Sequence, residues 1–453
     1  MPRFYVSFPS MNRYTHNSSI WGLGMLLFLA SCAMNTTPQS GSVNKVNPWQ
    51  PESRTYEEFI KSVQFYPGPP NQGAGLKALS PVIYLNDPSS FLSLEFDELV
   101  PRDTPVSLFY ADITNCDANW NPTNVLPIEF YEGFTRDPVD IYQRSEFTKV
   151  EYIHYLYSFP QENEYFKKSG NYILTVYRNN SKDSPVLTQR FVVVEPRVGL
   201  AITNLLQTRI ERSRLSKVNF QIDIEGLSII DPARDLNIKV IQNFRWDNDL
   251  RISRPSFLGR NSLEYSMNVM PDFPSGTEFY QLNSRSYRLY GQSVENIRET
   301  PQITYVSLFP DKVRNRNEFG PIRDRNGVFT VEVDEWPDPT LNADYNWVNF
   351  TLQSEPREEE VYLWGKLTDW RLTAANKMAY SEAERAYVGK LLLKQGIYDY
   401  QYVLKKADGS IDELSLNGKF GDRENFYDIL IYYRSPTDRT DQLLGLYPLN
   451  YYR

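Results

Sequence analysis

Cysteine and histidine are scarce in this 453-residue sequence, which contains only two of each. Two cysteines can form at most one disulfide, so the fold must depend on hydrophobic cores. His16 lies in a segment that we expect to be removed, which leaves His154 as the only histidine available for a catalytic triad. Residues 151–156 alternate in the manner of a β-strand, so a structural role is expected for His154.

Recognisable catalytic and ligand-binding motifs are also missing. The sequence contains no Gly-x-Ser-x-Gly elbow, P-loop, Gly-x-Gly-x-x-Gly or His-Glu-x-x-His motif. The Asp and Asn clusters at 117–119 and 247–249 do not continue as EF-hand loops and are more typical of turns. We therefore expect no enzyme, no catalytic residue, no metal and no cofactor. Glycan hydrolysis by two unrecognised carboxylates is the weakest of the remaining function classes.

Charge and aromatic content narrow the fold class. With 56 acidic and 48 basic residues the net charge is −8, which is poorly suited to nucleic acid, and no nucleic-acid partner is expected. The 32 tyrosines, 25 phenylalanines and 30 prolines favour strands and turns over helices, because aromatic side chains suit half-buried pleated surfaces. An all-β chain is predicted.

The N-terminal residues have the features of a lipoprotein signal peptide. Arg13 precedes an apolar run at 20–30, and small residues lead up to Cys32. The run is shorter than the roughly 20 residues that span a bilayer. We expect residues 1–31 to be removed and Cys32 to be lipidated, which anchors the chain to a membrane and leaves Cys116 without a partner. The alternative is a buried N-terminal helix with Cys32 as an ordinary thiol.

Beyond Cys32 the sequence predicts a flexible tether and a series of sandwiches. Residues 32–56 are mostly polar, with few apolar side chains to bury. Short alternating runs bounded by turn residues follow, as in strand 91–96, where Leu92, Leu94 and Phe96 alternate with residues expected to face water. We predict three consecutive immunoglobulin-like antiparallel β-sandwich domains, at 57–196, 197–340 and 341–453.

Several stretches, in the same order along the chain, resemble the type IX secretion system plug proteins of Bacteroidetes, formerly a domain of unknown function. The first domain carries Phe96-Asp97-Glu98-Leu99, Cys116-Asp117-Ala118-Asn119-Trp120, Glu132-Gly133-Phe134, Ser145-Glu146-Phe147-Thr148, Ser169-Gly170-Asn171-Tyr172 and Arg190-Phe191-Val192-Val193. Later matches are Gln242-Asn243-Phe244-Arg245-Trp246-Asp247-Asn248, Gly276-Thr277-Glu278-Phe279, Ala343-Asp344-Tyr345 and Asp428-Ile429-Leu430-Ile431-Tyr432-Tyr433-Arg434. Asn115 and Asn119 depart from the family pattern, which has His and Asp there, so no ligand is assigned to that loop.

This resemblance implies a non-catalytic periplasmic protein that docks on the large outer-membrane β-barrel translocon of the system and plugs its pore. Broad, rigid sandwich surfaces suit such a role. The residues after Cys32 lack an acidic cluster of the kind that marks surface-exported lipoproteins in this phylum. The expected location is therefore the outer membrane, with the lipid-anchored protein facing the periplasm.

The predicted third domain also looks like the immunoglobulin-like module found as a starch-binding domain. The resemblance covers residues 361–370, 389–393 and 396–403. In that module tryptophans stack on sugar rings. Trp364 lies inside an apolar strand and is expected in the core, whereas Trp370 follows Asp369 in a turn and is the candidate carbohydrate-binding residue. A carbohydrate-binding outer-membrane lipoprotein is therefore the alternative function.

Overall fold

The computed structural model describes residues 49–70, 77, 79–207, 215–227, 229–252, 254–266, 273–274, 278–314, 324–418 and 426–450. The predicted all-β class is confirmed, because nearly all regular structure in these ranges is strand. The short helices are α2 (Pro127–Phe130), α3 (Pro232–Asp235), α4 (Pro339–Asn342) and the 3-10 turn η2 (Lys366–Thr368). None of the helices in the described ranges is long and apolar enough to cross a membrane. The predicted signal peptide and Cys32 lie outside the described residues.

The first sandwich packs two sheets around one aromatic core. One sheet has the order β1 (Arg54–Thr55), β12 (Pro185–Val194), β11 (Gly170–Arg178), β5 (Phe109–Cys116) and β7 (Arg136–Val139), with β3 (Val82–Tyr84) parallel to β12. The other has the order β2 (Ile60–Pro67), β4 (Leu92–Leu99), β9 (Tyr152–Phe159) and β8 (Ile141–Arg144). A small pair, β6 (Tyr131–Glu132) and β10 (Tyr165–Phe166), closes one end. Phe96 of the second sheet meets Phe109 of the first edge-to-face, with 5.4 Å between ring centroids.

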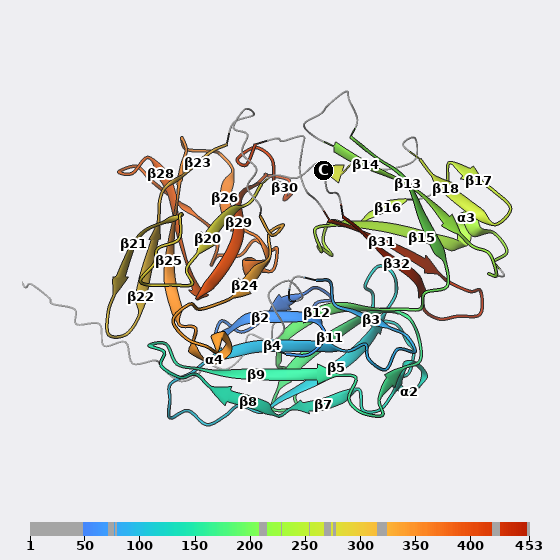
Figure 1. The fold of residues 1–453 in the computed structure, drawn as a ribbon, viewed down its shortest axis with the longest axis horizontal. Coiled ribbons are helices and arrows are strands. Elements are labelled where there is room, and N and C mark those ends of the chain that lie inside the picture. Colours follow the sequence, from blue (N-terminus) through green and yellow to red (C-terminus); the bar gives the residue numbers. More distant parts are fainter. Residues whose placement is uncertain are drawn as a thin grey trace, which may run out of the picture. The chain divides into compact units, whose positions relative to one another are not determined.

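The middle sandwich joins strands from two distant parts of the chain. One sheet contains β13 (Gly199–Gln207), β14 (Leu215–Asp223), β18 (Ser262–Tyr265) and β17 (Phe257–Leu258), with β19 (Phe273–Pro274) paired to β14. The other contains β16 (Leu250–Ile252), β15 (Leu236–Gln242), β31 (Phe426–Tyr433) and β32 (Gln442–Asn450). Figure 1 shows β31 and β32, from the end of the chain, beside β15. Ile238 and Ile429 are both fully buried in the shared core.

In the sequence, the third sandwich lies between the two segments that form the middle sandwich. One sheet contains β20 (Tyr280–Asn283), β29 (Gly396–Lys405) and β24 (Phe329–Val331), with β26 (Glu360–Trp364) and β30 (Ile411–Asp412) paired to the distal half of β29. The other has the order β21 (Val294–Glu299), β22 (Thr304–Leu308), β25 (Tyr345–Gln353), β28 (Ala386–Lys394) and β27 (Ala379–Ser381), with β23 (Asp311–Lys312) on β25. Phe350 and Tyr400 meet edge-to-face across the core, 4.9 Å apart.

The sheets therefore divide the chain differently from the predicted domain ranges. Strands β20 to β22 fall within the predicted range 197–340 but pack into the third sandwich, and β31 falls within 341–453 but completes the middle one. The end of the predicted tether is also ordered onto the first sandwich, because β1 pairs with β12. Alternation along a strand reports its own two faces and carries no information about its distant partner.

The polar face of β4 corrects a second expectation. Ser93 and Glu95 were expected to face water, yet they are 0% and 3% exposed, and Asp97, the next residue on the same face, is 1% exposed. Within the first sandwich, Ser93 donates to the carbonyl of Gly68 at 2.8 Å, and Glu95 accepts from the Nζ of Lys77 at 2.8 Å. Asp97 is reached from the third sandwich, where Lys394 of β28 places its Nζ 2.7 Å from Oδ2. His154 places Nδ1 2.8 Å from the other oxygen of Asp97, which agrees with its expected structural role. This buried network joins the first and third sandwiches.

The first and middle sandwiches are joined by an apolar contact. Cys116, Ile173 and Val192 of the first sandwich pack in one cluster with Ile241 and Leu430 of the middle one. Because β11 contributes Ile173 here and Leu174 to its own core, both faces of that strand are buried. The described strands thus belong to one compact unit, and segments of all three sandwiches line one cavity within it.

Candidate functional site

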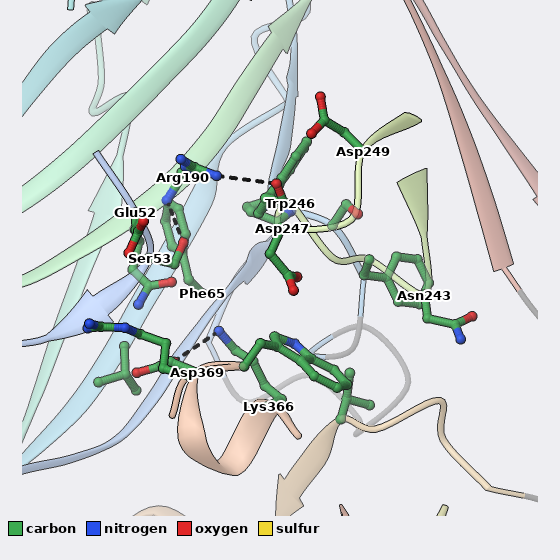
Figure 2. A pocket seen from close by; sticks show the side chains of 18 of the residues that line it. Glu52, Ser53, Phe65, Arg190, Asn243, Trp246, Asp247, Asp249, Lys366 and Asp369 are labelled. Carbon is green, nitrogen blue, oxygen red and sulfur yellow. Dashed lines mark hydrogen bonds and ion pairs between the residues drawn. The ribbon is translucent and has the colours of Figure 1, made fainter. Parts of the chain in front are cut away.

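A cavity of about 590 Å³ lies where the three sandwiches meet. The first sandwich supplies residues of β2 and β12 and the loop after β5, the middle one supplies the loop between β15 and β16, and the third supplies β24 and the turn around η2. Figure 2 shows labelled side chains of β2, of β12, of the loop between β15 and β16 and of the turn around η2 about one shared space, with the carboxylate of Asp247 and the ammonium group of Lys366 directed toward it. The volume falls within the range of roughly 300–1,000 Å³ typical of small-ligand sites.

Arg190 of β12 forms one wall of the cavity. Its guanidinium lies over the ring of Trp120, 4.6 Å from the centroid. The Nε donates to the carbonyl of Pro51 at 2.6 Å, and Nη1 donates to the carbonyl of Trp246 at 3.3 Å. No carboxylate is within ion-pair distance among the described residues, and burial lowers the pKa of Arg190 below its ordinary value. The site therefore holds a half-buried positive charge that donates hydrogen bonds to backbone carbonyls, while Glu52, Asp249 and Asp247 act on it from beyond ion-pair distance.

The carboxylates of the cavity wall, in contrast, are mostly paired. Asp249 accepts from the Nζ of Lys239 at 2.6 Å, and Asp247 accepts from Nη2 of Arg245 at 2.6 Å. Asp369 lies 3.4 Å from the Nζ of Lys366. Cationic side chains of the protein itself therefore balance most of the negative charge of these three carboxylates.

Backbone strain gathers around the same cavity. Five bulky or polar lining residues have left-handed backbone conformations, with φ of 68° at Trp120, 55° at Asn243, 59° at Phe244, 52° at Asp369 and 56° at Trp370. Such a conformation costs a non-glycine residue on the order of 1–2 kcal/mol. Three separate loops carry this cost, and strained residues concentrate at functional sites.

Trp370, the predicted carbohydrate-binding residue, lines this cavity and is half-buried. One side of its ring system is held by Trp364 and by the guanidinium of Arg245, at centroid distances of 4.8 Å and 4.7 Å. A Cβ at Gly327 would lie 2.3 Å from Cη2 of Trp370, so the backbone itself presses against the indole. Trp364 is fully buried, as its place in an apolar strand predicts. Sugar stacking on Trp370 stays a prediction.

The loop after β5 was a second focus of the sequence, because it carries Cys116 and Asp117. Cys116 is fully buried, and burial raises the pKa of its thiol to about 12. Asp117 accepts from the backbone N–H groups of Asn119 and Asn121 at 2.8 and 2.9 Å, which is the turn arrangement that the sequence predicts. A packed thiol beside a turn describes this loop, and Trp120 at its end reaches the cavity.

Sequence reasoning named Arg190, Asn243 and Asp247 only within family-matching stretches and did not predict that they line one cavity. Gln189 and Arg190 are adjacent in β12, and Arg371 follows Trp370 in a turn. No motif or spacing connects them, because they come from segments about 180 residues apart in the sequence. The one sequence feature that could have indicated the cavity is the position of Trp120, Trp246 and Trp370 in connections between strands. Tryptophans are often largely buried in cores, so this feature is not specific to a binding site.

Comparison with known proteins identifies the class to which the first sandwich belongs. The family described as "Type 9 secretion system plug protein 1st domain" matches residues 60–195, which span β2 to β12. Residues 60–195 are thus a plug-protein first domain, and the family resemblance read from the sequence is confirmed. For the whole chain, this match supports the coarse class of a type IX secretion system component.

The solved structures extend the likeness beyond this domain. The chain is similar to a crystal structure of a hypothetical protein from Parabacteroides merdae, with 29% identity, a TM-score of 0.81, and coverage of 88% of this chain and 99% of that one. Dimeric latent PorU from Porphyromonas gingivalis shares 10% identity over 86% of this chain and 34% of that one, and its TM-score of 0.13 carries no argument. No curated protein matches the chain.

Proposed function

We propose that this protein docks on the periplasmic side of the large outer-membrane β-barrel translocon and plugs its pore without catalysis. The observation that supports this most is the plug-protein first domain at residues 60–195. Occlusion needs a body that does not deform under load. The buried Asp97–Lys394 pair and the apolar contact around Cys116 suit that requirement, because they fix the first sandwich to its two neighbours.

The docking proposal is tested by affinity purification from membranes with the lipid anchor intact. We expect a β-barrel far larger than this protein to copurify. Recovery of the protein without such a barrel, from cells that express the secretion system, would overturn the docking proposal. Plugging is tested separately by measuring the leakage of small solutes from cells that lack the protein. Loss of a subunit that seals the pore should increase this leakage, whereas loss of a subunit that docks without sealing it should leave the leakage unchanged.

The lipid anchor on Cys32 and its periplasmic orientation belong to the same proposal. Cys32→Ser should move the protein from the membrane to the soluble fraction, because a single acylated cysteine would carry the anchor. Cys116→Ser is the matched control, since it removes the chain's other cysteine and should leave the protein in the membrane. Protease added to intact cells should not digest the protein, and digestion would contradict the orientation.

Carbohydrate binding is the second candidate function, and it rests on the position of Trp370 in the wall of the cavity. If it holds, the protein binds soluble glucans and Trp370→Ala abolishes the binding. Retention of glucan binding in this variant would remove Trp370 from the site.

A further inference from the structure

One end of the first sandwich carries four large apolar side chains that the protein leaves uncovered. Leu126 and Ile128 at α2 are 60% and 72% exposed, Phe134 after β6 is 76% exposed, and Tyr165 of β10 is 53% exposed. We call these four residues the apolar tip. Figure 1 shows α2 at the end of this sandwich that lies away from α4. Single exposed apolar residues are common on protein surfaces, whereas a group of them marks an interaction site.

Hydrogen bonds to the residues beside β10 hold the segments of the apolar tip together. Lys167, just after β10, donates from its Nζ to the carbonyl of Ile128 at 3.1 Å. Glu164, just before β10, accepts from the backbone N–H of Phe134 at 3.1 Å. Both α2 and the turn at Phe134 are therefore fixed to the strand that carries Tyr165. A surface that is already ordered loses little conformational entropy when a partner binds.

The charged groups around the apolar tip are largely satisfied within the protein. Three ion pairs surround it, namely Lys167–Glu132, Arg439–Glu129 and Lys168–Asp438. Residues 126–135, 161–168 and 438–439 together contain five carboxylates and three cationic side chains. These described segments therefore have no surplus of positive charge, and attraction to an anionic partner does not select the occupant. The apolar side chains themselves must do so.

A lipid surface suits side chains arranged in this way. Leu126, Ile128 and Phe134 project from turns and are more than half exposed, so a folded partner would need a separate pocket for each. The hydrocarbon region of a bilayer takes up such side chains without a fixed shape. The phenol of Tyr165 has an apolar ring and a polar hydroxyl, which suits the boundary between hydrocarbon and water.

The place where the described chain begins allows this contact. Trp49 is attached to β11, where its Nε1 donates to the hydroxyl of Thr175 at 3.0 Å. Thr175 is five residues from Gly170, the end of β11 that follows β10, which corresponds to roughly 17 Å along the strand. The residues from Cys32 to Trp49 can extend to about 60 Å. An acyl group on Cys32 and the apolar tip can therefore reach the same bilayer.

We propose that the apolar tip inserts into the lipid surface to which Cys32 anchors the protein. The tip is a second membrane contact, and it sets the orientation of the first sandwich, which a flexible tether alone leaves free. The anchor keeps the tip at a high local concentration, so a weak affinity of the tip itself is sufficient. Because the surrounding charges have no positive surplus, the contact is made to zwitterionic lipid. This proposal rests on the proposed anchoring at Cys32 and goes beyond it.

Cosedimentation with vesicles tests the tip separately from the anchor. The chain from residue 33 onward has neither signal peptide nor acyl group, and it contains the whole compact unit described above. We expect it to sediment with sucrose-loaded phosphatidylcholine vesicles, equally at about 0.1 M and about 0.5 M NaCl. No binding, or binding that requires phosphatidylglycerol and is lost at the higher salt concentration, would overturn the proposal. Failure of the anchor itself would leave this result unchanged.

Two double variants of the same chain locate the contact. Ile128→Ser with Phe134→Ser should lower the partition coefficient at least about tenfold, because two large apolar groups no longer leave water. Phe257→Ser with Leu258→Ser is the matched control, since these residues are 63% and 53% exposed on the middle sandwich, and it should change nothing. Circular dichroism checks that both variants are folded.

Equal partition of the two double variants would overturn the proposal. A further outcome would assign the tip to a protein partner instead. In that case the tip variant binds vesicles as the unmodified chain does, but in the full acylated protein it no longer copurifies with the large barrel.

Discussion

Replacing Lys394 by methionine should cost the protein a large fraction of its stability. The Nζ of Lys394 is 2.7 Å from Asp97, and their side chains are 2% and 1% exposed. The same ammonium donates to the carbonyl of Thr340 at 2.8 Å and lies 4.0 Å from the ring centroid of Tyr152. Methionine fills similar space but leaves the carboxylate of Asp97 buried without its cation. Its remaining partners are His154 at 2.8 Å and the hydroxyl of Tyr345 at 2.7 Å.

The expected loss in the free energy of unfolding is about 3–5 kcal/mol, the range for breaking a buried ion pair from one side. Partial satisfaction by His154 and Tyr345 places the expectation at the lower end. Urea unfolding of the full chain at pH 7, followed by far-UV circular dichroism, measures it. Combining Lys394→Met with Asp97→Asn should restore part of the loss, because the unpaired charge is then gone.

Lys390→Met is the control for this prediction. Lys390 is in the same strand, β28, and is exposed, with its Nζ 4.8 Å from the ring of Trp347. An exposed cation–π contact of this kind contributes about 0.5–1 kcal/mol. If Lys394→Met destabilises the chain no more than Lys390→Met does, the buried pair does not hold the first and third sandwiches together.

Three further predictions concern buried groups. Burial raises the pKa of Asp428 to about 7, so folding favours its protonated form and stability should fall as the pH rises from about 4 to about 7. Relative to the unmodified protein, Asp428→Asn should therefore raise the midpoint of thermal unfolding more at pH 8 than at pH 4. An equal change at both pH values would contradict the raised pKa of Asp428. Gly327→Ala should destabilise the protein by about 1–3 kcal/mol more than Gly409→Ala. Both glycines have a left-handed φ (83° and 85°), but only at Gly327 would the Cβ collide with Trp370. Equal denaturant midpoints of the two variants would show that the indole of Trp370 moves aside. Cys116, fully buried and with a raised pKa, should react with Ellman's reagent only after unfolding, and rapid labelling of the folded protein would place the thiol at the surface.

Part of the fold follows directly from local sequence pattern. The alternating run predicted at 91–96 is β4, Leu92–Leu99. The burial of Trp364 also follows from the apolar strand around it. These features depend on a period of two residues, which the neighbouring side chains alone establish.

The polar face of β4 marks the limit of that reasoning. Ser93, Glu95 and Asp97 have the pattern of a solvent-facing row, and a strand with such a row is normally half-exposed. Here a lysine almost 300 residues away in the sequence satisfies the carboxylate of Asp97, and Lys77 satisfies that of Glu95, so both charges are buried. Burial of a charge depends on its partner, and no pattern within the strand indicates that partner.

The sequence alone determined the all-β class, most strand positions and the membership of residues 60–195 in the plug-protein domain family, because alternation and local motifs are properties of neighbouring residues. Only the tertiary structure decided that β31 completes the middle sandwich by pairing with β15. It also decided that Gln189, Arg190 and Arg371 line one cavity. Both results depend on packing between segments about 180 to 200 residues apart in the sequence, where strand pairing and side-chain fit choose among partners that look alike in sequence.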